Sequence, residues 1–230
     1  MSVRSRARSA EETVPSPLLL GHRGTRVIPA IPENTLAAFD RAMADGCHGF
    51  EFDVRLTADG EAVVCHDAKV EGFEIAHSQA RQLRSLPRLK DVLTRYRHAF
   101  LDIELKVAGI EAIALTALQE HRPGRFVVSS FLPEVLRTLR SLDAVVPLGL
   151  ICETSAQLRL WKKLSVEYVI PHRKLVRRGL ISDLHQSGKK VLVWTVNSAA
   201  EMRRFGAWGV DGMISDYTRR LAETLVSPAR

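Results

Sequence analysis

The sequence contains few cysteines and no long apolar run. Cys47, Cys65 and Cys152 are the three cysteines among 230 residues, and none belongs to a CxxC pair. Their odd number and wide separation argue against a disulfide framework and a cysteine-ligated zinc site, and a reducing, cytoplasmic compartment is expected. The apolar runs are far shorter than the about 20 residues of a membrane span, so we expect no integral membrane association. The apolar stretch at residues 18–20 is also too short for a signal peptide.

The composition is that of a globular chain. Hydrophobic residues make up 46% of the sequence and charged residues 26%, which is enough to build a core without disulfides. We expect a mobile N-terminal tail over residues 1–16 and a single domain over residues 17–230, a length that one α/β barrel can fill. The net charge of +7 suits a nucleic acid, a membrane surface or a phosphorylated substrate, and it does not distinguish among them.

Short apolar segments alternate with amphipathic helical segments from residue 17 onward, an order typical of a parallel sheet. A turn at residues 58–60 predicts a hairpin between residues 49–56 and 61–66. Apart from that hairpin partner, eight strands predict a (β/α)8 TIM barrel, whereas the alternative, an open doubly wound sheet, lacks a GxGxxG after its first strand. The expected strands are residues 18–22, 49–56, 98–106, 126–131, 146–152, 166–171, 191–196 and 211–216, and the expected helices are residues 33–45, 89–96, 110–121, 133–141, 155–164, 177–187 and 198–207.

Charged side chains interrupt two strands that should be buried. Glu51 and Asp53 lie two residues apart and therefore share one face of their strand, and Glu104 and Lys106 repeat this spacing. Three carboxylates facing into a barrel would repel one another, and a divalent cation would relieve that repulsion. Oxygen ligands of this kind predict Mg²⁺ or Ca²⁺. The alternative is an ion pair with the lysine that satisfies the barrel interior without any metal.

Two histidines end predicted strands. His22 ends the first strand and His66 ends the hairpin strand, so both belong to the carboxyl face, where barrel enzymes place their active sites. A single histidine at a strand end is more often structural, but two of them beside carboxylates favour an acid/base pair. His172, after another strand, is a further candidate for substrate contact.

Three further residues have two interpretations each, and a fourth, Asn34, has one. Arg23, in a loop flanked by glycines, can bind a phosphate or pair on the surface with a nearby acid. Glu33 can fix that loop or reach the site, and Asn34 is the expected N-cap of the first helix. Trp194 can form an apolar wall for a substrate or pack in the core.

Seven short motifs follow one another along residues 18–216. They are Gly21-His22-Arg23-Gly24, Pro32-Glu33-Asn34-Thr35, Glu51-Phe52-Asp53, His66-Asp67, Glu104-Leu105-Lys106, Ser129-Ser130-Phe131 and Trp194-Thr195-Val196-Asn197. Each motif alone is weak, but the ordered set resembles the glycerophosphodiester phosphodiesterase family, whose members are TIM barrels of the phospholipase C-like phosphodiesterase type.

This resemblance implies metal-dependent hydrolysis of glycerophosphodiesters to sn-glycerol 3-phosphate and an alcohol. A small-molecule glycerophosphodiester is then the expected partner, with no nucleic acid. By residue, the resemblance implies metal ligation by Glu51, Asp53 and Glu104, acid/base catalysis by His22 and His66, and phosphate binding by Arg23 and Lys106. Glu33, Trp194 and His172 are weaker expectations for the substrate pocket.

The sequence departs from the family pattern after His66-Asp67, where the inserted region before residue 89 is short. A short insertion predicts an open pocket mouth and leaves the alcohol undetermined. One alternative is therefore a lysophospholipase D-like enzyme on the same barrel. A remote alternative is a non-catalytic anion- or nucleic-acid-binding protein, although no basic helix or RNA-binding motif supports it.

Overall fold

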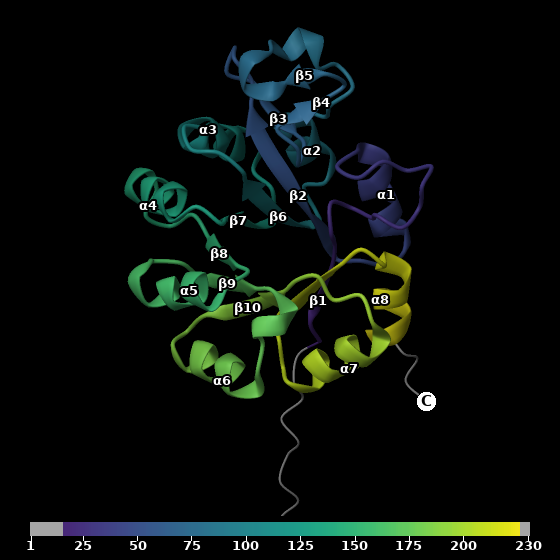
Figure 1. Cartoon of the computed structure of the whole chain (residues 1–230), viewed down its shortest axis with the longest axis vertical. Coiled ribbons are helices and arrows are strands. Elements are labelled where there is room, and N and C mark those ends of the chain that lie inside the picture. Colours follow the sequence, from purple (N-terminus) through teal and green to yellow (C-terminus); the bar gives the residue numbers. More distant parts are fainter. Residues whose placement is uncertain (1–15, 226–230) are drawn as a thin grey trace, which may run out of the picture.

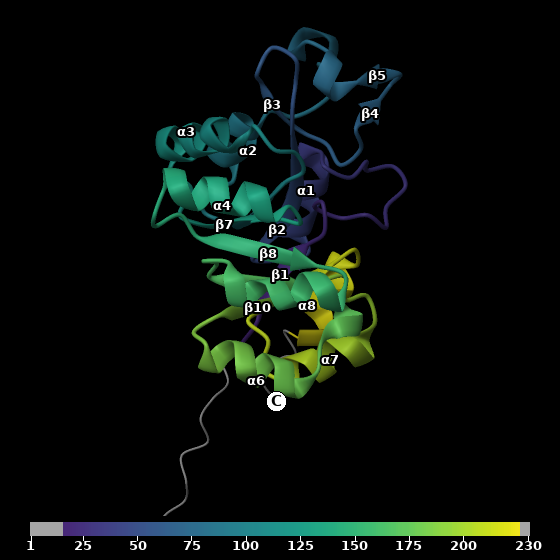
Figure 2. The same cartoon turned by 60° about the vertical axis from the view of Figure 1, so that its left-hand side comes forward.

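Eight parallel strands close into a barrel with helices on its outside, which confirms the predicted fold class (Figures 1 and 2). The computed structural model describes residues 16–225, so the tail expected over residues 1–16 lies outside the described residues except for Ser16. Each strand pairs in parallel with the next, and β1 pairs with both β2 and β11 to close the barrel. The strands are β1 (Leu18–Gly21), β2 (Gly49–Leu56), β6 (Phe100–Leu105), β7 (Arg125–Ser130), β8 (Leu148–Cys152), β9 (Tyr168–Pro171), β10 (Lys190–Val193) and β11 (Gly212–Ser215).

The helices follow the strands in the predicted order. They are α1 (Leu36–Ala44), α2 (Leu89–Arg95), α3 (Glu111–His121), α4 (Pro133–Leu142), α5 (Ser155–Leu158), α6 (Arg178–Gln186), α7 (Ala199–Ala207) and α8 (Thr218–Leu225). Three differ from the prediction: α1 begins at Leu36 and not at residue 33, α5 continues as the 3₁₀ helix Arg159–Lys163, and α8 was not expected. No helix within residues 16–225 is long and apolar enough to cross a membrane.

The predicted hairpin and insertion lie beyond the end of β2, where they project from the barrel (Figure 2). Strand β3 (Ala62–Val64) runs antiparallel to β2, and a two-stranded sheet of β4 (Lys69–Val70) and β5 (Phe73–Glu74) follows. The insertion buries its own small cluster of Val63, Cys65, Ile75 and Leu83. Because β3 contributes to this cluster, we propose that the insertion and the barrel form one domain.

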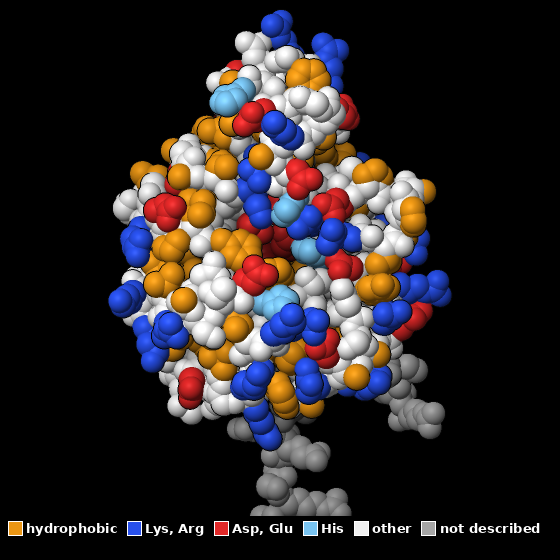
Figure 3. All heavy atoms as spheres, in the orientation of Figure 1, with side chains coloured by type: hydrophobic (Ala, Val, Ile, Leu, Met, Phe, Trp, Pro, Cys, Tyr) orange, Lys and Arg blue, Asp and Glu red, His pale blue; other side chains and the backbone are white. Residues whose placement is uncertain are grey.

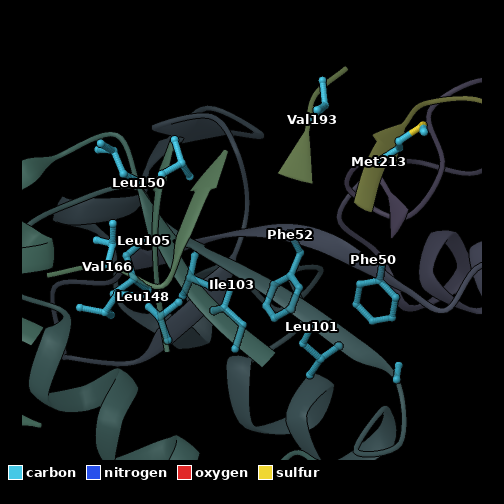
Figure 4. Packing of buried hydrophobic residues seen from close by; sticks show 14 of the residues in the cluster. Phe50, Phe52, Leu101, Ile103, Leu105, Leu148, Leu150, Val166, Val193 and Met213 are labelled. Carbon is cyan, nitrogen blue, oxygen red and sulfur yellow. The ribbon is translucent and has the colours of Figure 1, made fainter. Parts of the chain in front are cut away.

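The largest aromatic cluster lies between the barrel and its helices (Figure 4). Phe50 and Phe52 point outward from β2, as their alternation with the carboxylates predicted. The ring of Phe39 from α1 stacks on Phe50 at a centroid distance of 4.2 Å, and Tyr96 meets Phe50 edge-on at 4.9 Å. A separate cluster fills the barrel interior with Leu20, Phe100, Val127, Ile151, Tyr168, Ile170, Leu192 and Ile214.

The expected start of the first helix was wrong by three residues. Thr35, not Asn34, is the N-cap of α1, and its side chain accepts a hydrogen bond from the backbone N–H of Ala38. Asn34 instead adopts a left-handed φ of 57° and is buried. Its amide donates a 2.8 Å hydrogen bond to Asp53 of β2, so a contact distant in sequence outweighs the local capping preference.

Removing the Phe50 ring tests the barrel–helix packing. Phe50 is fully buried, whereas Phe73 in the insertion is 38% exposed, so the same substitution at the two positions isolates burial. We expect Phe50→Ala to lower the free energy of unfolding by about 3–5 kcal/mol and Phe73→Ala by less than about 1 kcal/mol, as measured by urea denaturation. Equal losses in the two variants would contradict this packing.

Candidate active site

A pocket of about 300 Å³ opens at the carboxyl ends of the barrel strands. Figure 3 shows it as a hollow near the centre of this face, with acidic side chains in its depth and histidines and cations around it. All eight parallel strands end at this face, so side chains distant in sequence converge here. The lining residues are His22, Arg23, Glu51, His66, Asp102, Glu104, Lys106, Phe131, Ile151, Glu153, Ile170, Trp194 and Ile214.

The register of two neighbouring strands sets four carboxyl groups side by side. Glu51 of β2 lies opposite Asp102 of β6, and Asp53 lies opposite Glu104. All four are buried. One carboxylate oxygen from each of Glu51, Asp53 and Glu104 lies within 4.8 Å of the others, a grouping that can hold a metal ion. The predicted ligands therefore meet, although Asp53 lies below the pocket surface and does not line it.

The carboxylates are crowded and incompletely paired, as a cation site requires. Burial, followed by the charges of Asp53 and Glu104, raises the pKa of Glu51 well above its ordinary value. Burial and then Asp53 raise the pKa of Glu104 to about 7, although Lys106 opposes them. The buried Glu51 Oε1 and Asp53 Oδ1 accept no hydrogen bond. Buried oxygens of this type suit a hard divalent cation.

Two positively charged side chains, Lys106 and Arg23, offset the negative charge of the carboxylates. Lys106 Nζ lies 2.6 Å from Glu104 Oε1 and 3.3 Å from Asp53 Oδ1, the latter too poorly aligned for a hydrogen bond. Arg23 Nε lies 3.3 Å from Asp53 Oδ2, and the backbone N–H of Arg23 donates to Glu51 Oε2 at 2.9 Å. Burial opposes ionisation of Asp53, but Lys106 and Arg23 outweigh it and lower the pKa of Asp53.

His22 is buried, and the ring nitrogen that faces away from Glu51, Asp53 and Glu104 forms a hydrogen bond with Asp216. Its Nδ1 lies 2.7 Å from Asp216 Oδ1, while its Nε2 is 3.9 Å from Glu51 Oε2. Burial lowers the pKa of His22, and its hydrogen bond to the Asp216 carboxylate only partly opposes this effect. The neutral imidazole is therefore favoured near pH 7, the form that a general base needs.

His66 also lines the pocket and is more exposed than His22. Its Nδ1 lies 2.8 Å from Asp67 Oδ1. The backbone carbonyl of His66 accepts two hydrogen bonds from the Arg55 guanidinium, at 2.8 Å and 2.6 Å. Arg55 follows Glu51 and Asp53 at period two on β2, so the strand that carries two carboxylates also anchors this histidine.

Of the three weaker candidates for the substrate pocket, one lines the pocket and two do not. Trp194 lines the pocket, where its Nε1–H donates to the carbonyl of Ile170 at 2.9 Å. His172 packs edge-on against Trp194 at 5.2 Å but does not line the pocket. Glu33 does not line it either and instead bonds the guanidinium groups of Arg23 and Arg26, as its loop-fixing interpretation predicted.

Sequence reasoning missed two acidic residues near the site. Asp102 lines the pocket and has its pKa raised to about 7, mainly by burial, although the Ser129 hydroxyl donates to it at 2.6 Å. Its period-two spacing from Glu104 was a signal that could have identified it. Asp216 follows the last strand, 194 residues from His22, and only barrel closure brings the two together.

Comparisons with known proteins agree with this fold. The sequence profile of the glycerophosphoryl diester phosphodiesterase family matches residues 22–220. A glycerophosphodiester phosphodiesterase from Caldanaerobacter subterraneus subsp. tengcongensis is 30% identical to the chain, across 93% of this chain and 98% of that protein. A putative glycerophosphodiester phosphodiesterase from Bacillus subtilis is 29% identical, across 86% of this chain and 94% of that protein.

Solved structures show the same barrel. A phosphodiesterase from Oleispira antarctica, in complex with the product sn-glycerol-3-phosphate, superposes with a TM-score of 0.81 at 25% identity, over 92% of this chain and 98% of that one. A putative glycerophosphoryl diester phosphodiesterase from Silicibacter pomeroyi has a TM-score of 0.84 at 24% identity, over 92% of this chain and 94% of that one, and supports the fold. The chain therefore belongs to the glycerophosphoryl diester phosphodiesterase family and is a phosphoric diester hydrolase.

Proposed function

We propose that this enzyme hydrolyses glycerophosphodiesters to sn-glycerol 3-phosphate and an alcohol, with a bound Mg²⁺ or Ca²⁺ and two histidines as acid and base. The observation that carries this proposal is the convergence of His22, His66, the carboxylate cluster and two cations on one pocket. The Oleispira antarctica relative, bound to sn-glycerol-3-phosphate, supports the choice of product.

Glu51, Asp53 and Glu104 are the residues that would hold the divalent cation. When bound, such an ion polarises phosphoryl oxygens and stabilises the charge that develops on them. With the carboxylate charge compensated in this way, Lys106 and Arg23 can turn toward the phosphate. Lys106 offers a point charge, and Arg23 offers a planar fork that fits two phosphoryl oxygens.

Two histidines on one pocket suit a two-step hydrolysis. In the first step, neutral His22 removes the proton from the neighbouring glycerol hydroxyl, whose oxygen attacks phosphorus, while protonated His66 gives its proton to the departing alkoxide. A cyclic phosphate forms and the alcohol leaves. In the second step, His66 takes a proton from water, which opens the ring, and His22 returns its proton to the glycerol oxygen.

The opposite wall of the pocket is apolar except for Glu153. Phe131, Ile151, Ile170, Trp194 and Ile214 line it. We assign this wall to the carbon skeleton of the glycerol, because excluding water there strengthens the interactions of the phosphoryl group with the charged wall.

A lysophospholipase D-like enzyme must hold the acyl chain of its substrate. That chain would need an exposed apolar path beside the pocket. Within residues 16–225, the large hydrophobic side chains that are exposed are Val27, Phe73, Leu142 and Val145, and none of these four lines the pocket. This distribution favours water-soluble glycerophosphodiesters over lysophospholipids.

Substrate and metal requirements are tested together with glycerophosphocholine. We expect release of glycerol 3-phosphate that stops in EDTA and returns when Mg²⁺ or Ca²⁺ is added in excess. Without the metal ion, the carboxylates would hold the side chains of Lys106 and Arg23 away from the phosphate. Lysophosphatidylcholine should turn over more slowly under the same conditions. Full activity in EDTA would rule out the metal, and faster turnover of lysophosphatidylcholine would favour the lipid substrate.

Replacing each histidine tests acid/base catalysis. We expect His22→Ala and His66→Ala to lower kcat by about 10²–10⁴-fold, since each removes one proton-transfer group. His77→Ala serves as the matched control because the His77 side chain is 77% exposed in the insertion, away from the pocket. Its kcat should equal that of the unmodified enzyme. Near-normal kcat in either pocket variant would contradict the assigned role.

Neutralising Glu51 tests the carboxylate cluster without any activity measurement. We expect Glu51→Gln to raise the free energy of unfolding of the metal-free protein by about 1–2 kcal/mol, because it removes the cost of burying or protonating this carboxyl group beside other carboxylates. The same change should abolish the rise in melting temperature that Mg²⁺ or Ca²⁺ produces. Glu223→Gln, at an exposed position on α8, is the control. Persistence of the full metal-dependent rise in Glu51→Gln would refute the assignment of Glu51 as a ligand.

A further inference from the structure

A chain of hydrogen bonds extends outward from His22 through two residues that do not line the pocket. His22 Nδ1 lies 2.7 Å from Asp216 Oδ1, and the other carboxylate oxygen, Asp216 Oδ2, accepts a 2.6 Å hydrogen bond from Asn197 Nδ2. Asp216 follows the last strand of the barrel and Asn197 lies in the segment between β10 and α7. Neither residue belongs to the carboxylate cluster.

A backbone N–H group determines how the Asn197 amide is oriented in this chain of hydrogen bonds. The backbone N–H of Asp216, which can only donate, points at Asn197 Oδ1 at 3.0 Å. The hydroxyl of Ser215 lies 3.1 Å from the same oxygen. The carbonyl end of the Asn197 amide is thereby identified, so its NH₂ end must face Asp216 Oδ2.

The carboxylate in the middle accepts on both sides. Burial opposes ionisation of Asp216, but its contacts with His22, Asn197 and Arg26 outweigh it and lower the pKa of Asp216. Arg26 Nη1 lies 3.5 Å from Asp216 Oδ1. An ionised carboxylate has no proton to donate, so the hydrogen atom between Asp216 and His22 must reside on Nδ1 of the histidine.

We propose that Asp216 and Asn197 are positioning residues that fix the tautomer of His22, with the proton on Nδ1 and the lone pair of Nε2 directed into the pocket. This inference rests on the proposed function, because it takes His22 as the general base. In the first step, Nε2 accepts the glycerol hydroxyl proton, and the resulting imidazolium keeps its Nδ1–H bond to Asp216. Asp216 takes up no proton, and Nε2 later returns its proton to the glycerol oxygen.

Barrel closure holds the chain of hydrogen bonds in place. Gly21 and Ser215 are paired between β1 and β11, and the backbone N–H of His22 donates to the Ser215 carbonyl at 2.9 Å. The carbonyl of Asp216 lies 3.3 Å from the Thr25 hydroxyl. His22 is thus anchored on the backbone of β11, and Asp216 is anchored on the loop that follows β1.

Asn197 makes the proposal sharply testable, because it determines how an asparagine at position 216 would orient. In Asp216→Asn, the new amide must turn its oxygen toward the Asn197 NH₂ group, so its own NH₂ faces His22 Nδ1. The imidazole is then driven into the opposite tautomer, with the proton on Nε2. We expect kcat to fall by about 10²–10⁴-fold with KM nearly unchanged.

Exchanging the two residues should reverse that loss. In the double variant Asp216→Asn with Asn197→Asp, the carboxylate at position 197 accepts the NH₂ of the new amide, whose oxygen is again free to accept from His22 Nδ1–H. The position 197 carboxylate also still accepts from the Asp216 backbone N–H and from Ser215. We expect kcat to recover at least about tenfold over Asp216→Asn, a rescue that a purely structural role for Asp216 would not produce.

A matched control exists at the other end of the last strand. His185 Nε2 lies 2.8 Å from Asp211 Oδ2, also a histidine–aspartate contact, but outside the pocket. Asp211→Asn should leave kcat unchanged. Nitrogen-15 NMR of His22 in the Mg²⁺-supplemented enzyme gives an independent readout. We expect a protonated Nδ1 in the unmodified protein and a protonated Nε2 in Asp216→Asn.

The outcomes separate this inference from the proposed function. An active His22→Ala variant would refute the catalytic role of His22 itself. With His22→Ala inactive, the positioning role is refuted by unchanged kcat in Asp216→Asn, or by failure of the folded double variant to recover. If Asp216→Asn does not fold, the NMR spectrum of the unmodified enzyme decides alone, and a neutral His22 protonated on Nε2 would overturn the proposal.

Discussion

The crowding of buried carboxylates is the constraint around which this site is built. One oxygen from each of Glu51, Asp53 and Glu104 lies within 4.8 Å of the others, in surroundings where like charges repel strongly. The first loop of the barrel is shaped to offset that repulsion. Arg23 and Asn34 both adopt left-handed backbone conformations, at φ values of 51° and 57°, which cost about 1–2 kcal/mol each for residues other than glycine. In return, Arg23 directs its backbone N–H and its guanidinium at the carboxylates, and Asn34 donates to Asp53.

The same constraint divides the pocket into two walls of different chemistry. Strands β1, β2 and β6 carry the charged wall or the loops that complete it, and β7 to β11 carry the other wall, which is apolar except for Glu153 after β8. A phosphodiester has the same division, with a charged phosphoryl group beside a carbon skeleton. In the proposed function, the apolar wall lowers the local dielectric, which would strengthen the interactions of the charged wall with the phosphoryl oxygens.

Local periodicity predicted most of the site, and contacts across the barrel seam account for the rest. Alternation along one strand placed Glu51 and Asp53 on the same face, because that relation depends only on the geometry of a strand. The contact between His22 and Asp216 depends instead on closure of the barrel between its first and last strands, which no local pattern contains. Asn34 shows the same distinction, since its capping propensity was visible in the sequence but its partner on β2 was not. The two-residue strands β4 and β5 were too short to produce a periodic signal.

Strand contacts also explain how two histidines on irregular segments can keep a defined position. His66 lies beyond β3, but the guanidinium that binds its carbonyl comes from β2, the strand that carries two of the carboxylates. His22 lies beyond β1, and its ring contacts the residue that follows β11. Each histidine is therefore held by a contact from a barrel strand or from the residue that follows one. The contact of His66 is made through its backbone carbonyl, and that of His22 through its ring. Proton transfer needs heavy atoms within about 2.6–3.2 Å, and strands hold such distances more closely than loops do. In the proposed mechanism, closure of the barrel is thus part of the catalytic geometry, because it supplies the contact between His22 and Asp216.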